Sequence, residues 1–255
     1  MPQIHAVTLA LLERLPALSA GSVVLDVACG TGEPGLTLAR ATPSVQVHGY
    51  DQAEALLAVA KRKAEREALA NAQFTVASMH SLPRADASAD AVISRFGLLM
   101  FGEVPAAARE LARVLRPDAP FTIAVWDDPA RNTLMSALLS ILQPHLPKDR
   151  DSPMASLAEW AAEGRRARLL EELGLGPVQT EMFPWAYHFR TDDELWELVL
   201  SMDKFTGQAT LSAEIQAEVR RELLTSLAAY RQVDGQWSIP HACRLLWGRR
   251  SDKMS

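Results

Sequence analysis

A glycine-rich stretch and two aspartates are the residues of this chain whose types and spacing best suit ligand chemistry. Residues 25–35 read LDVACGTGEPG, and their glycines follow the G-x-G-x-x-G spacing that brings backbone amides close to a nucleotide-like ligand. Asp26 lies four residues before the first of these glycines, and Asp51 ends the next apolar run. A carboxylate beneath the turn disfavours a pyrophosphate and attracts a cation in a shielded site. The pattern therefore indicates a ligand with an ammonium group and neighbouring hydroxyls.

Each of these residues also has a purely structural interpretation. Asp26 can cap the backbone of the turn, Asp51 can cap the helix that follows it, and the glycines can form a tight turn without a ligand. The position of Asp51 suits a nicotinamide dinucleotide as well as S-adenosylmethionine, so it decides nothing alone. Asp26 favours S-adenosylmethionine, which carries an ammonium, a carboxylate, a sulfonium and a ribose.

The elements that position these residues alternate between apolar, β-rich runs and helical patterns. This alternation predicts an α/β protein with a Rossmann-like, doubly wound and mostly parallel sheet. In such a sheet, ligands bind beyond the carboxyl ends of the strands, where the turn after the first strand lies. Strands or extended runs are expected at 22–28, 45–50, 74–77, 91–94, 121–126, 178–189 and 241–247. Helices are expected at 53–68, 132–142, 157–173, 192–204 and 212–230, with another whose apolar face includes Val104, Ala108, Leu111 and Leu115.

The second half of the chain departs from this regular alternation. The simplest interpretation is a single domain over residues 1–255 with two elaborations. One is a helical cap at about 128–157, between the fifth strand and its helix. The other is a helical insertion at about 191–232, before the last strand.

Composition limits the possible partners. The chain has 255 residues and a net charge of −5, which argues against nucleic acid and anionic membranes as partners. Its two cysteines are far apart and have no Cys/His cluster around them, so neither a disulfide framework nor a metal site is expected. No signal-peptide pattern or membrane-spanning apolar run occurs. We expect a cytoplasmic protein that acts on a small molecule; its oligomeric state is left open.

Four segments together resemble class I S-adenosylmethionine-dependent methyltransferases, and the UbiE-like methyltransferase-domain group most closely. They read VLDVACGTGEPG, GYDQAEALL, HSLPRADASADAVISRFGLLMF and ARELARVLRP, and the resemblance spans roughly residues 20–127. It implies a methyltransferase that binds S-adenosylmethionine and releases S-adenosylhomocysteine. The cofactor-binding residues that it implies are Asp26, Ala28, Gly30, Gly32, Asp51, Gln52, Ser78, Met79, Ser94, Arg95 and Phe96. Ser78 departs from the family, which commonly has an acid there for the adenine amino group.

The sequence shows no paired catalytic residues. Asp127 directly follows the fifth strand and His145 lies in the expected cap, so these two are the candidates for an assisting acid or base. Asp127 can equally cap the next turn, and His145 can be an exposed loop residue. Aromatic residues such as Trp126 and Trp185 are expected mostly in the core; any that face the cofactor favour an apolar or aromatic acceptor.

The predicted function is methyl transfer to an oxygen, nitrogen or carbon atom of a small, apolar or aromatic metabolite. Two alternatives remain open at this stage. One is a protein of the same fold that binds S-adenosylmethionine without methylating, as a binding module or as a catalyst of cyclisation or rearrangement. The other, less favoured, is an NAD(P)-dependent oxidoreductase.

Overall fold

The computed structural model describes residues 4–100, 102–146, 160–162, 164–202 and 211–251. Its centre is a seven-stranded sheet in the order β3-β2-β1-β4-β5-β7-β6. All neighbouring strands are parallel except β7, which runs antiparallel to both β5 and β6. This order confirms the predicted α/β class and the doubly wound, mostly parallel sheet. The strands are β1 Val23–Val27, β2 Gln46–Asp51, β3 Ala72–Val76, β4 Ala91–Arg95, β5 Pro120–Trp126, β6 Gln179–Phe189 and β7 Trp237–Arg249.

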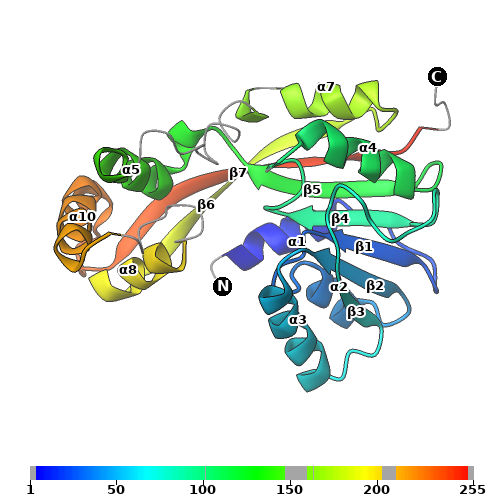
Figure 1. The fold of residues 1–255 in the computed structure, drawn as a ribbon, viewed down its shortest axis with the longest axis horizontal. Helices are drawn as coiled ribbons and strands as arrows, with labels where there is room; N and C mark the ends of the chain where they lie inside the picture. Colours follow the sequence, from blue (N-terminus) through cyan, green and yellow to red (C-terminus); the bar gives the residue numbers. More distant parts are fainter. Residues whose placement is uncertain (1–3, 101, 147–159, 163, 203–210, 252–255) are drawn as a thin grey trace.

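Helices cover both faces of the sheet (Figure 1). One face carries α1, α2 and α3, and the other carries α4 and α7. Three further helices, α5, α8 and α10, lie away from the centre of the sheet. The helices are α1 His5–Glu13, α2 Gly35–Ala41, α3 Glu54–Arg66, α4 Val104–Val114, α5 Thr133–Leu142, α7 Arg165–Glu172, α8 Asp192–Ser201 and α10 Ala213–Ser226. Among the described residues, none of the helices has the length and apolar character needed to cross a membrane.

The two elaborations come together on the long antiparallel pair of strands β6 and β7. β6 and β7 continue past the end of β5, because Trp126 pairs with Cys243 whereas β7 begins at Trp237. Around this extension α5, from the expected cap, packs with α8 and α10, from the expected insertion (Figure 1). Their contacts form a second core that includes Leu138, Leu195 and Leu223. We call this part of the molecule, α5, α8, α10 and the extension of β6 and β7, the far lobe.

Three elements differ from the sequence-based prediction, each for a local reason. The helix expected at 157–173 has its main segment at α7, and Gly164, with a left-handed φ of +72°, directly precedes that segment. The last strand starts at Trp237 rather than His241; Pro240 is accommodated because β5 no longer pairs with β7 there. The helix α1, which the pattern did not indicate, buries Val7 and Leu11 against the sheet.

The turns after β1 and β4 approach each other closely. A Cβ added to Gly97, after β4, would lie 2.3 Å from the Cβ of Ala28, after β1. We expect Gly97→Ala to lower the free energy of unfolding by about 2–3 kcal/mol, because the two turns must move apart. Chemical denaturation measures the change.

Gly235→Ala is the matched control for this variant. Its added Cβ would meet no atom within 4 Å, although its φ is +83°. Only backbone strain of about 1 kcal/mol is expected there. Equal effects of the two substitutions would show that the packing of Gly97 on Ala28 contributes nothing specific.

Candidate functional site

The glycine turn is held by the aspartate at the end of β2. Asp51 accepts hydrogen bonds from the backbone N–H of Gly30 and of Ala53, both at 2.8 Å. The first bond fixes the turn after β1, and the second holds the backbone of Ala53, the residue that directly precedes α3. The side chain of Lys63 donates to the carbonyl of Thr31 at 3.0 Å and ties α3 to the same turn. Asp51 is half-buried, and a carboxylate with two acceptor bonds still has lone pairs for further hydroxyl donors.

Asp26 lies beneath the turn and is completely buried. Its Oδ2 accepts the Gly35 N–H at 2.8 Å, so the capping role considered from the sequence is present. Its Oδ1 is buried and has no hydrogen-bond partner. Burial raises the pKa of Asp26 from 3.8 to about 8, and the Gly35 N–H and the charge of Arg95 oppose that rise. A cation that reached Oδ1 would satisfy an atom that is otherwise costly to bury.

The turn after β4 closes onto the glycine turn. Ser94 is buried and donates from its hydroxyl to the carbonyl of Val27 at 2.6 Å, which joins β4 to β1. The same hydroxyl oxygen accepts the N–H of Leu98 at 3.2 Å. Phe96 has a left-handed φ of +60° and stacks on Trp126, with ring centroids 4.1 Å apart. Ser94 thus acts through the backbone of this turn, while Phe96 forms part of its half-buried surface.

The side chain of Arg95 points toward α1. It donates to the hydroxyl of Thr8 and, at 3.4 Å, to the carbonyl of Ile4. Burial lowers its pKa, and the nearby charges of Glu33 and Asp26 oppose that lowering. The side chain is therefore covered by α1 and the residue before it. Arg95 thus lies near the two acidic side chains Glu33 and Asp26.

The segment after β3 places the residues expected around an adenine. Ser78 accepts from the N–H of His80 at 3.2 Å, and its hydroxyl lies 3.2 Å from Nδ1 of the same histidine. Met79 packs partly against the main core, and Gln52 is exposed beside Asp51. The sequence-based comparison expects an acid at the position of Ser78. Here a serine occupies it, and its hydroxyl lies next to His80. The roles of Ser78, Met79 and Gln52 toward a cofactor remain predictions.

Among the residues that the structure describes, no contact joins the two catalytic candidates, Asp127 and His145. Asp127 is buried, and its carboxylate lies 3.1 and 3.2 Å from Nη2 of Arg244 and 3.4 Å from Nη1 of Arg131. It also accepts the N–H of Asp128 at 2.9 Å. These contacts give it a structural role between β5, β7 and the start of the cap. His145 lies in the short helix η3, directly after α5 of the far lobe.

The structure adds two buried side chains that the sequence did not indicate. Arg166 of α7 donates from Nε to the carbonyl of Leu99 at 2.9 Å, and burial lowers its pKa to about 10. His241 of β7 is 5% exposed and lies among the rings of Trp126, Trp185 and Tyr187. Its signal in the sequence was weak, because only the strand pairing brings it beside aromatic residues distant in the chain.

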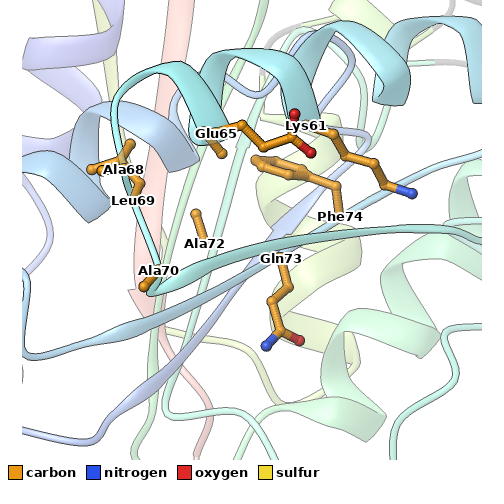
Figure 2. A pocket seen from close by; sticks show the side chains of 9 residues that line it. Lys61, Glu65, Ala68, Leu69, Ala70, Ala72, Gln73 and Phe74 are labelled. Carbon is orange, nitrogen blue, oxygen red and sulfur yellow. The ribbon is translucent and has the colours of Figure 1, made fainter.

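An open pocket of about 520 Å³ lies elsewhere, between α3 and β3 (Figure 2). Lys61 and Glu65 line it from the helix, and Gln73 and Phe74 line it from the strand. It adjoins the α3–β3 connection at the amino end of β3, whereas the glycine turn follows the carboxyl end of β1. This pocket is therefore not part of the candidate site.

Comparisons with known proteins find methyltransferases among the similar sequences. Residues 24–118 match the family model described as a methyltransferase domain. A demethylmenaquinone methyltransferase of Thermus thermophilus is 37% identical over 108 residues, which cover 42% of this chain and 49% of that protein. The chain spans about half the length of the curated relatives that it matches.

Solved structures share the fold over nearly the whole chain. YcgJ of Bacillus subtilis superposes with a TM-score of 0.62 at 20% identity, covering 98% of this chain and 99% of that one. Phosphoethanolamine N-methyltransferase 2 of Haemonchus contortus, solved with S-adenosyl-L-methionine, gives 0.59 at 18% identity and covers 97% and 53%. The fold is therefore that of the class I methyltransferases. Residues 24–118 of this chain are similar in sequence to a methyltransferase domain.

The buried acid makes a testable contribution to stability. A carboxyl whose pKa is higher in the folded than in the unfolded state stabilises the fold at low pH, and that stabilisation is lost as the pH rises toward the folded value. Asp26→Asn removes the titration and keeps the shape. We expect the free energy of unfolding of the variant, relative to that of the wild type, to increase by about 1 kcal/mol or more between pH 5 and pH 9. Urea denaturation without ligand measures it. Asp234→Asn, on an exposed turn, controls for the loss of one charge. Parallel pH profiles would contradict the assignment.

Proposed function

We propose that this protein transfers a methyl group from S-adenosylmethionine to a small, apolar or aromatic acceptor. The observation that carries the proposal is the glycine turn between two acids, one of which keeps a buried carboxylate oxygen without a partner. The methyltransferase-domain match over residues 24–118 and the methyltransferase names of the relatives support it. The acceptor atom, whether oxygen, nitrogen or carbon, stays open.

The residues of the turn suit the chemical groups of this cofactor. Asp26 has a free acceptor oxygen for an ammonium group, and Asp51 has lone pairs left for ribose hydroxyls. Gly30 and Gly32 have left-handed φ values of +53° and +96°, so their backbone can approach a ligand closely. Ala28 and Phe96 lie at the two turns that meet beside them, where the reactive end is expected. When bound, the cofactor supplies an electrophilic methyl group on a sulfonium.

The contribution of the protein to the reaction is then mainly positioning. Asp127 is already engaged by two arginines and a backbone amide, which leaves it poorly placed to take a proton from an acceptor. His145 lies directly after α5, at the edge of the far lobe. Proximity and orientation can supply a large part of a rate enhancement without a base. A protein of this fold that binds S-adenosylmethionine without methylating is the competing possibility, and the appearance of S-adenosylhomocysteine with candidate acceptors separates the two.

The cofactor assignment is tested by ligand-induced stabilisation. S-adenosylmethionine or S-adenosylhomocysteine at ~100 times the dissociation constant should stabilise the fold by about 2.7 kcal/mol and raise the melting temperature. NAD and NADP should not. Stabilisation by NAD alone would overturn the assignment.

The role of Asp51 is tested by Asp51→Asn. The substitution keeps an acceptor oxygen for the turn but removes the charge that holds the ribose hydroxyls. The free energy of cofactor binding, measured by calorimetry, should become less favourable by about 1.5–3 kcal/mol. Asp193→Asn, on the exposed face of the far lobe, should bind like the wild type. Unchanged affinity in Asp51→Asn would show that Asp51 only holds the backbone of Gly30 and Ala53.

A further inference from the structure

A cluster of rings extends from the turn after β4 to the paired strands β6 and β7. The aromatic cluster consists of Phe96, Trp126, Trp185, Tyr187 and His241. Trp126 stacks on Phe96, and its ring centroid lies 6.1 Å from that of Trp185. Since Gly97, next to Phe96, touches Ala28 of the glycine turn, the cluster begins at the proposed cofactor site. Phe96, Trp126 and Trp185 are half-buried, so the cluster keeps an accessible side.

His241 and Tyr187 are the two ionisable rings of this cluster. It is paired across the strands with Trp185, and it lies two residues beyond the last pairing of β5 with β7. Its ring centroid is 4.6 Å from that of Tyr187 and 5.3 Å from that of Trp185. Burial lowers the pKa of His241 to about 4, and interactions with the backbone of Ile239 and Pro240 oppose that lowering. The imidazole is therefore neutral near pH 7 and can accept a hydrogen bond.

Two polar atoms of this cross-strand pair lack partners. Nδ1 of His241 and Nε1 of Trp185 are both buried, and neither has a hydrogen bond. Buried polar atoms in folded proteins are nearly always paired, so an unpaired atom indicates a missing ligand or water. Here one atom can accept and the other donates. A hydroxyl group has the chemistry for both, because its hydrogen can be donated to Nδ1 of His241 while its oxygen accepts from Nε1 of Trp185, and the two ring centroids are 5.3 Å apart.

We propose that the aromatic cluster binds the methyl acceptor, and that His241 and Trp185 select a flat apolar ring that carries a hydroxyl group. This inference rests on the proposed function only for calling the ligand the methyl acceptor. The ring of the ligand packs against the half-buried faces of Trp126 and Trp185. A ring without a hydroxyl leaves both polar atoms unpaired, which is the basis of the discrimination. A cationic ligand can use the ring faces, but a quaternary ammonium satisfies neither nitrogen.

The test compares 2-naphthol with 2-methoxynaphthalene, which has the same ring system but cannot donate a hydrogen bond. Binding to the full-length protein is measured by calorimetry, with and without S-adenosylhomocysteine. The wild type should bind 2-naphthol at least about tenfold more tightly. In His241→Phe, which keeps an aromatic ring and removes both nitrogens, the preference should fall to about twofold or less. In His241→Asn, whose amide oxygen can accept in place of Nδ1, part of the preference should return.

His188→Phe is the matched control, since His188 lies on β6 but is exposed. It should keep the preference of the wild type. Equal binding of the two probes by the wild type, an unchanged preference in His241→Phe, or no binding of 2-naphthol would each overturn the proposal. Tighter binding of phenyltrimethylammonium than of 2-naphthol would also overturn it and assign the cluster to a cation. Failure of S-adenosylhomocysteine to bind, with the naphthol preference intact, would contradict the proposed function and leave this inference standing.

Discussion

The arrangement of the site depends on two carboxylates that hold the backbone of one turn. Backbone N–H groups must be paired when they are removed from water, and Asp51 and Asp26 accept those of Gly30 and Gly35. These bonds connect β1, the glycine turn, α2 and the end of β2. They also leave little room, because a Cβ on Gly35 would lie 2.7 Å from the Asp26 carboxylate. The turn that is proposed to receive the cofactor is therefore formed before any ligand binds.

Charged side chains then attach the outer elements to this centre. Arg95 connects the end of β4 to α1 through Thr8, so the first helix is fixed beside the turn. Asp127 and Arg244 join β5 to β7 near the point beyond which β6 and β7 extend past the end of β5. Past that point, β6 and β7 contribute Trp185, Tyr187 and His241 to the aromatic cluster and form the far lobe with α5, α8 and α10. The same two strands thus bring the rings that we propose to bind the acceptor close to the proposed cofactor site, and they support three helices.

Much of the sheet could be predicted from the sequence because it depends on local patterns. The strands around residues 22–28, 45–50 and 121–126 were apolar enough to be recognised, and their order follows from the fold class. The helix α1 could not be predicted in this way, since its stability comes from packing on the sheet. The neighbours of Asp127 and His241 were also out of reach, because Arg244 and Trp185 lie far from them in the chain. Long-range pairing, rather than spacing, decides what those side chains do.

The central claim is that the glycine turn and its two acids bind the ammonium and ribose of S-adenosylmethionine, and proton-linked calorimetry tests it most directly. Asp26 has a pKa of about 8 without ligand, so at pH 7 it must lose its proton to pair with an ammonium group. Titration of S-adenosylhomocysteine at pH 7, in buffers of different ionisation enthalpy, should show binding with the release of nearly one proton. Asp26→Asn should release none. Absence of binding would contradict the account as a whole, and binding without proton release would show that Asp26 only caps the turn.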